Sequence, residues 1–178
     1  MVLRPDSFTE QGQEVLGSSQ EIVRRYHHSQ WDVEHILLAL LELEKGVPVE
    51  VLRQLGVPLD AMKRQVEEAL ERTPRIGHEA QQIYVTPRAT RLMENAKAEA
   101  DRLKDEFIGA EHMLIAATLE RQGDASRILQ GFGVDQEKVY KALVEIRGGH
   151  RVTDPRAESR YRSLEKFSID LTALAREG

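Results

Sequence analysis

A short apolar run that opens with a Glu-His pair occurs twice in this chain, and the duplication restricts the folds available to it. The first copy begins at Asp32 (DVEHILLALL) and the second at Gly109 (GAEHMLIAA), so they are 109 − 32 = 77 positions apart. Without a gap, residues 8–69 laid on residues 85–146 share eleven identical positions, whereas about four are expected by chance. The core of the protein is therefore a tandem repeat.

Hydrophobic spacing within the repeats indicates helices. Apolar residues recur at intervals of three and four, which is the spacing of one helical face, and no segment alternates long enough to predict a strand. Start signals such as Thr86-Pro87 and stop signals such as Gly56 divide each repeat into four helices. The sequence predicts an all-α fold, a compact bundle of about eight helices built from two tandem four-helix repeats.

The start of the first helix has two candidates. Ser7 with Glu10 forms a capping box, in which each side chain bonds the backbone of the other residue. Thr9 is the alternative N-cap, by analogy with its repeat partner Thr86. Both starts are compatible with the apolar pattern that follows.

The composition changes where the repeats end. We expect one duplicated domain over residues 1–147, with repeat one at about 8–71 and repeat two at about 85–147. Residues 148–160 are polar and rich in turn formers, which predicts a solvated linker. Residues 161–178 follow as a short amphipathic helical tail without a visible partner in the repeats. This arrangement indicates that the chain is cut from something longer.

Composition and charge exclude several classes of function. The formal net charge of −5 at pH 7 gives no electrostatic case for binding nucleic acid or an anionic membrane surface. The absence of cysteine excludes disulfides, thiol catalysis and cysteine-based zinc sites. No uncharged apolar run has the length of a membrane span, and the N-terminus lacks the apolar core of a signal peptide. We expect a cytoplasmic protein.

Several motifs resemble those of Clp-type AAA+ unfoldases. Glu-His-Ile-Leu-Leu at 34–38, Gly-Val at 56–57 and Thr-Pro-Arg-Ala at 86–89 resemble the duplicated N-terminal domain of that family. Residues 164–178 resemble the lead-in to its first ATPase module. Arg-Gly-Gly at 147–149 with the charged linker is closest to the ClpB disaggregase branch, whereas the Glu-His pairs look more like the ClpC protease-partner branch.

The resemblance implies the substrate- and adaptor-binding N-terminal domain of an ATP-dependent Clp chaperone of the stress response. Such a domain would recognise unfolded or aggregated proteins, including arginine-phosphorylated ones, and pass them to a hexameric motor. The parent protein would use ATP and Mg. This chain contains no G-x-x-x-x-G-K-[ST] phosphate loop. We therefore expect a monomeric fragment without cofactor or ATP hydrolysis, and without nucleic-acid or membrane partners.

Two other classes of function compete with this interpretation. A stand-alone adaptor built from the same repeats would have no motor, but it would also have no use for the tail at 161–178. A small hydrolase or metalloenzyme has only scattered histidine and glutamate residues in its favour. The tail therefore favours the chaperone domain over the adaptor.

The repeated glutamates are the leading candidates for a binding site. Glu34 and Glu111 open otherwise apolar helices, where a carboxylate either caps the helix or binds a peptide. The resemblance implies that they hold the guanidinium of phosphoarginine, with Thr9 or Thr86 near the phosphate. The 77-residue offset predicts two equivalent sites, Thr9 with Glu34 and Thr86 with Glu111. Asp105 matches a polar position that ClpB-type domains place beside their threonine and glutamate.

The neighbours of these glutamates qualify the expectation. The residue before each glutamate is threonine in the phosphoarginine-reading pattern, whereas this chain has Val33 and Ala110. His35 and His112 follow the glutamates, but neither belongs to an H-E-x-x-H arrangement that would suggest a metal site. We expect both histidines to be core or capping residues, and we expect no metal site.

Overall fold

The computed structural model describes residues 4–78 and 80–158, and within them the chain forms eight α-helices, one short 3-10 helix (η1) and two strands. In chain order these elements are η1 Pro5–Ser7, α1 Glu10–Arg25, β1 Gln30–Trp31, α2 Val33–Glu42, α3 Val47–Gln54, α4 Leu59–Arg72, β2 Tyr84–Val85, α5 Pro87–Arg102, α6 Ala110–Leu119, α7 Asp124–Gly131 and α8 Gln136–Arg147. The predicted all-α bundle of about eight helices is confirmed. The predicted tail at 161–178 lies outside the described residues.

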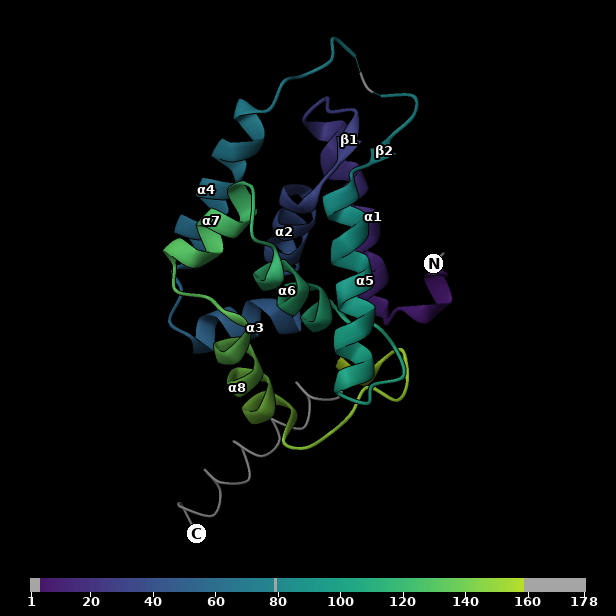
Figure 1. Cartoon of the computed structure of the whole chain (residues 1–178), viewed down its shortest axis with the longest axis vertical. Helices are drawn as coiled ribbons and strands as arrows, with labels where there is room; N and C mark the ends of the chain where they lie inside the picture. Colours follow the sequence, from purple (N-terminus) through teal and green to yellow (C-terminus); the bar gives the residue numbers. More distant parts are fainter. Residues whose placement is uncertain (1–3, 79, 159–178) are drawn as a thin grey trace.

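The two apolar runs form the central helices α2 and α6. Both are buried along almost their whole length, which explains why neither has a polar face in the sequence. They contact each other in the middle of the molecule, while α1 packs along α2 and α5 along α6 (Figure 1). One continuous hydrophobic cluster contains residues from both repeats, so the repeats share a single core.

The two repeats exchange their first residues. The Thr9 N–H group donates to the Ile108 carbonyl at 2.9 Å, and 77 positions later the Thr86 N–H group donates to the Trp31 carbonyl at 3.1 Å. Strand β2 pairs in parallel with β1, and Phe8 makes the equivalent bridge to Ile108. The first pairing joins two residues on each side and the second joins one, too few to show an alternating pattern. The sequence therefore predicts no strand.

The outer helices also pack between repeats. Helix α3 of repeat one packs on α8 of repeat two, and α4 of repeat one packs on α7 of repeat two (Figure 1). Helices α3 and α7 are followed by glycines at equivalent positions, Gly56 with φ 76° and Gly133 with φ 71°. This left-handed conformation favours glycine, and it explains why both residues recur in the sequence.

Thr9, rather than Ser7, is the N-cap of α1. The Thr9 hydroxyl accepts a hydrogen bond from the Gly12 N–H group at 3.0 Å. Thr86 caps α5 in the same way, through the Ala89 N–H group at 3.1 Å. Ser7 lies instead in η1, where its carbonyl accepts from Ile108.

The chain after α8 differs from the solvated linker expected over residues 148–160. Residues 150–158, here called the return segment, run back to the lower end of α5 (Figure 1). Val152 and Ala157 are 0% and 3% exposed, and the Glu106 N–H group donates to the Val152 carbonyl at 2.7 Å. Two buried apolar residues and this backbone bond attach the segment to the repeats. The domain boundaries themselves stay predictions.

Helix α1 offers a matched test of the exchange contact. A Cβ atom added at Gly12 would lie 2.8 Å from the Ile108 carbonyl oxygen, whereas one added at Gly17 would meet nothing within 4 Å. Gly12→Ala should lower the free energy of unfolding by about 1–3 kcal/mol, because the helix must move off the backbone of the other repeat. Gly17→Ala should raise it by about 0.5–1 kcal/mol, since alanine is the better helix former. Urea unfolding measures both, and equal effects of the two changes would contradict the contact.

Candidate functional site

The N-terminus of α2 carries a cluster of charged and polar side chains. Asp32 caps the helix through the Val33 N–H group at 2.8 Å, and the Thr86 hydroxyl donates to the same Asp32 oxygen at 2.9 Å. Arg88 donates to Asp32 Oδ2 at 2.8 Å and to Glu34 Oε1 at 2.9 Å. We call Asp32, Glu34, Thr86 and Arg88 the open cluster.

The open cluster is partly accessible to water. The side chains of Glu34 and Arg88 are 12% and 23% exposed. Burial and the Asp32 charge raise the pKa of Glu34, although Arg88 and the Ala125 N–H group oppose this. For Asp32, burial acts to raise the pKa, but hydrogen bonds from Arg88, Val33 and Thr86 outweigh it and the pKa is lowered. The cluster therefore holds one guanidinium between an ionised aspartate and a second carboxyl group.

A pocket of about 220 Å³ opens beside the open cluster. It is lined by His28, Ser29, Gln30, Asp32, Glu34, His35, Leu70, Thr73 and Pro74. Two of these residues are acidic and none is cationic at neutral pH, because burial lowers the pKa of both His28 and His35. The pocket suits a basic side chain.

The N-terminus of α6 carries a second cluster, which is closed. Asp105 Oδ2 lies 2.7 Å from His112 Nε2 and 2.9 Å from an Arg147 nitrogen, and Arg147 also donates to Glu111 Oε2 at 3.1 Å. The other Asp105 oxygen accepts from the Val152 N–H group at 2.9 Å. The side chains of Asp105 and Glu111 are 0% exposed and that of Arg147 is 7% exposed. We call these residues the closed cluster.

The charge balance of the closed cluster is internal. Burial acts to raise the pKa of Asp105, but hydrogen bonds from His112 and Val152 and the charge of Arg147 outweigh it, so the pKa is lowered. Asp105 is therefore ionised, and Arg147 stands between it and Glu111. Both carboxylates are inaccessible to water, so a peptide cannot reach them unless the cluster rearranges.

Glu158 of the return segment completes this region. Its carboxyl group accepts hydrogen bonds from the Thr9 hydroxyl and from the Ala110 N–H group, the latter at 3.3 Å. Glu158 is 1% exposed. In repeat one the equivalent bonds go to Asp32, whose counterpart 77 positions later is Gly109. Glu158 thus supplies the carboxyl group that Gly109 lacks.

The predicted pairing of threonines and glutamates is wrong. Thr9 bonds Glu158 near Glu111 of repeat two, and Thr86 bonds Asp32 beside Glu34 of repeat one. The cause is the exchange of the first residues between the repeats, which places each threonine against the other central helix. The open cluster is therefore built from both repeats, whereas the closed cluster lies within repeat two and Thr9 of repeat one bonds Glu158 beside it.

Asp105 does lie with Glu111, as the resemblance implied, through their shared partner Arg147. Sequence reasoning missed Asp32, Arg88 and Arg147 as members of the clusters, together with Glu158. One feature of the sequence could have indicated a group such as Glu158 at the start of the second central helix. The N-cap is aspartate in one repeat and glycine in the other, which indicates that another group fills the space.

His35 and His112 cap the central helices, as predicted. Nδ1 of His35 accepts from the Asp32 N–H group at 3.0 Å, and Nδ1 of His112 accepts from the Gly109 N–H group at 2.7 Å. Each ring then carries its proton on Nε2. His112 directs that proton to Asp105, whereas His35 directs it to Nδ1 of His28 at 2.8 Å.

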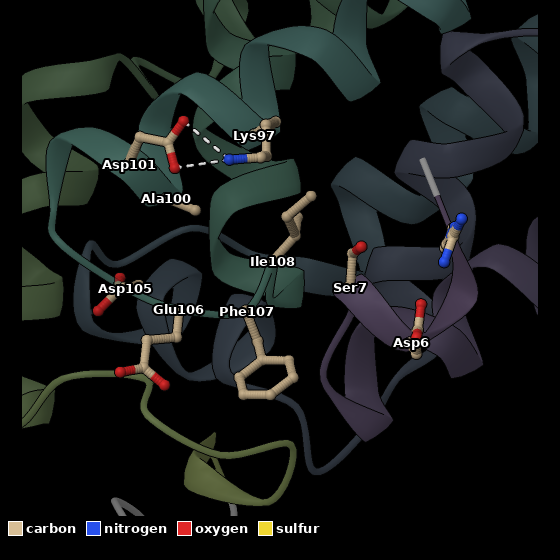
Figure 2. Close-up of a pocket in the computed structure, with 10 residues that line it drawn as sticks. Asp6, Ser7, Lys97, Ala100, Asp101, Asp105, Glu106, Phe107 and Ile108 are labelled. Atoms are coloured by element: carbon tan, nitrogen blue, oxygen red, sulfur yellow. Dashed lines mark hydrogen bonds and ion pairs between the residues drawn. The ribbon is translucent and has the colours of Figure 1, made fainter. Parts of the chain in front are cut away.

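A further pocket of about 320 Å³ lies beside Asp105 (Figure 2). It is lined by Arg4, Asp6, Ser7, Lys97, Ala100, Asp101, Asp105, Glu106, Phe107 and Ile108. Figure 2 shows Ser7 facing Ile108, and Lys97 bonded to Asp101 on the rim. The carboxylate of Asp105 is committed to His112, Arg147 and Val152. We assign no binding chemistry to this pocket.

Among residues 4–78 and 80–158, no three His, Asp or Glu side chains lie close enough together to hold a metal ion. In the same part of the chain, no helix is both long and apolar enough to cross a bilayer.

Removal of the buried cation from the closed cluster should destabilise the fold more than removal of the cation from the open cluster. Arg147→Met leaves Asp105 and Glu111 without their buried cation, which should lower the free energy of unfolding by about 3–5 kcal/mol. Arg88→Met should cost only about 1–2 kcal/mol, because water reaches the open cluster. Urea unfolding compares the two, and an equal loss would mean that burial does not separate the clusters.

The histidine pair of repeat one should make stability depend on pH. Burial and the neighbouring His28 lower the pKa of His35 from 6.5 to about 4. As the pH falls below 6.5, His35 of the unfolded chain binds a proton, whereas His35 of the folded protein stays neutral until about pH 4. The free energy of unfolding should therefore be highest above pH 6.5 and fall by about 3 kcal/mol towards pH 4. His35→Gln should flatten this slope, since glutamine can still cap the helix. Thermal unfolding from pH 4 to 7 would show the difference, and parallel curves would contradict it.

The fold and the sequence both match known proteins. Residues 7–132 match the family described as Clp repeat (R) N-terminal domain. The chain is 37% identical over 175 residues to Chaperone protein ClpB 1 of Nostoc sp. (strain PCC 7120), covering 98% of this chain and 20% of that protein. It thus spans about a fifth of the length of the curated relatives it matches.

Solved structures share the fold. The Hsp104 N-terminal domain from Candida albicans matches with a TM-score of 0.75 at 20% identity, over 85% of this chain and 99% of that one. A ClpV N-domain in complex with a VipB peptide matches with a TM-score of 0.57 at 18% identity, over 79% and 86%. Together with the family match over residues 7–132, these findings establish that the chain belongs to the Clp repeat N-terminal domain family.

Proposed function

We propose that this chain is the substrate- and adaptor-binding domain of a ClpB-type chaperone, and that the open cluster receives basic side chains of unfolded peptides. The observation that carries the proposal is Arg88, which Asp32 and Glu34 hold at 2.8 and 2.9 Å beside the 220 Å³ pocket. The cluster already binds one guanidinium from its own chain. The family match and the peptide complex of the related ClpV N-domain support a peptide ligand.

Accessibility distinguishes the two clusters as binding sites. Glu34 reaches both solvent and the pocket, whereas Glu111 and Asp105 are fully buried under Arg147 and the return segment. Burying an additional charge in a closed site costs several kcal/mol unless it is paired. Binding a charged ligand at the open cluster therefore costs less desolvation free energy than binding it at the closed cluster.

The geometry favours an unmodified basic side chain over phosphoarginine. A phosphate needs hydrogen-bond donors, but the Thr86 hydroxyl donates to Asp32 and the Thr9 hydroxyl donates to Glu158. Val33 and Ala110 add no hydroxyl group. A phosphate at the open cluster would also face two carboxyl groups, which repel it.

The remaining properties belong to the parent protein that the proposal assumes. Its motor would bind ATP and Mg, assemble as a hexamer and unfold or disaggregate the captured protein in the cytoplasm. This chain would act as a monomeric recognition domain. Its partners would be unfolded or aggregated proteins and adaptor proteins.

A binding titration tests the proposal. Glu34→Gln removes one carboxylate from the pocket, and losing a charge-assisted hydrogen bond costs about 1.5–3 kcal/mol. The affinity for a fluorescently labelled, permanently unfolded protein should therefore fall about tenfold to a hundredfold. Glu68→Gln, an exposed change elsewhere on α4, is the matched control and should bind like the parent.

Two results would count against the proposal. Unchanged affinity of the Glu34→Gln variant would make Glu34 a purely structural partner of Arg88. An equal loss in the Glu68→Gln control would mean that the overall negative charge, rather than the open cluster, attracts the substrate. Circular dichroism spectra of the variants should match that of the parent, so that altered folding does not explain the result.

A further inference from the structure

The second repeat contains a ready-made acceptor site at the start of α6. In repeat one, the Thr86 hydroxyl and the Val33 N–H group both donate to the Asp32 carboxylate. In repeat two the matching donors are the Thr9 hydroxyl and the Ala110 N–H group, but the N-cap is Gly109, which has no carboxylate. The donors are kept while their acceptor is missing from the helix.

The Glu111 carboxylate also points toward the space beside Gly109. A Cβ atom added at Gly109 would overlap Glu111 Oε1 and would lie 3.0 Å from Glu158 Oε1. Glu111 is 0% exposed, and its Oε1 accepts no hydrogen bond from any N–H or hydroxyl group of the described residues. A ligand here must therefore accept from the Ala110 N–H group and donate to Glu111, while the Thr9 hydroxyl can either donate to it or accept from it.

We propose that this place is a binding site for a protonated carboxyl or a carboxamide group, and that Glu158 is its resident ligand, which fastens the return segment through a proton shared with Glu111. Among side chains, only a protonated aspartate or glutamate, or the amide of asparagine or glutamine, offers an acceptor and a donor in one planar group. The inference does not depend on peptide binding by the open cluster.

The surroundings of Glu158 explain why its carboxyl group stays protonated. Burial and the Glu111 carboxylate raise the pKa of Glu158 well above its usual value, against the hydrogen bonds from Thr9 and Ala110. Arg147 of α8 bonds Glu111, the neighbour of Glu158, and it also bonds Asp105. Among residues 4–78 and 80–158 no second cation is paired with these two buried carboxylates, so they repel each other and one of them keeps its proton.

The charged groups around the site can be assigned. From α6 it faces Glu111, behind which His112 bonds Asp105. From the start of α1, Glu10 pairs with Arg156 of the return segment at 3.1 Å, on the surface. None of these contacts places a positive charge on the Glu158 carboxyl group.

Docking of the return segment has three backbone reporters. The Val152 N–H group donates to Asp105 Oδ1 at 2.9 Å, and the Glu106 N–H group donates to the Val152 carbonyl at 2.7 Å. The Glu10 N–H group donates to the Pro155 carbonyl at 2.9 Å. Release of the segment exposes all three amides to exchange with solvent.

Amide hydrogen exchange on the whole chain tests the proposal. Glu158→Ala should speed exchange at Val152, Glu106 and Glu10 about tenfold to a hundredfold, the effect of losing a buried hydrogen-bonded group. Glu158→Gln should keep the protection, because the amide oxygen can accept from the Ala110 N–H group while the amide nitrogen donates to Glu111 and to the Thr9 hydroxyl, which turns to accept. Exchange in α2 and α6 should stay slow in both variants, which shows that the fold survives.

The pH dependence separates the shared proton from other causes. Since the docked carboxyl group has the higher pKa, docking is strongest below the pKa of free glutamate, about 4.3. It should weaken by up to tenfold for each pH unit above that value, after correction for intrinsic exchange, until the docked group itself ionises. Glu158→Gln should remove this slope, whereas Glu137→Gln, an exposed change on α8, should leave it as in the parent.

Three outcomes would overturn the proposal. Exchange in Glu158→Ala equal to that in the parent would mean that Glu158 does not fasten the segment. Exchange in Glu158→Gln as fast as in Glu158→Ala would mean that the site needs a charged carboxylate. A pH slope that survives in Glu158→Gln would assign the titration to another group.

Discussion

The exchange of first residues between the repeats is the contact on which the rest of the structure depends. The hydrogen bonds from Thr9 to Ile108 and from Thr86 to Trp31 join the start of each repeat to the chain before the other repeat's central helix. Neither repeat can complete this pairing alone, which is why the two share one core. The same bonds place each threonine hydroxyl at the start of the other repeat's central helix, so the open cluster combines both repeats and Thr9 bonds Glu158 beside the closed cluster.

The two repeats have equivalent backbone contacts but different side chains at four equivalent pairs of positions. Asp32 corresponds to Gly109 and His28 to Asp105, while the two arginines correspond to uncharged residues, Arg88 to Gln11 and Arg147 to Leu70. Each repeat therefore obtains its cation from a different element, the start of α5 or the end of α8. The Arg88 side chain is 23% exposed and its cluster is accessible to water, whereas the Arg147 side chain is 7% exposed and its carboxylate partners are buried.

Local signals made the helices predictable, whereas the site depended on distant contacts. Apolar spacing, Thr86-Pro87 and Gly56 specify individual helices through interactions within a few residues, and the structure agrees with them. The offset of 77 also identified the important positions, but it implied pairing within a repeat. Exchange between repeats cannot be read from an offset, because parallel and crossed arrangements of a duplication give the same spacing. Burial of Val152 likewise depends on a surface that only the assembled repeats create.

The degree of burial also determines how a cluster can serve binding. A ligand guanidinium at the open cluster competes with Arg88, which is partly hydrated already and loses little when it turns to solvent. The exchange of one guanidinium for another is then nearly balanced in free energy, and net affinity comes from the adjoining pocket and from the rest of the peptide. Such a site would bind many sequences weakly and release them readily, which agrees with the proposed role in capturing unfolded proteins. The closed cluster cannot act in this way, because removing Arg147 leaves two buried carboxylates without a cation.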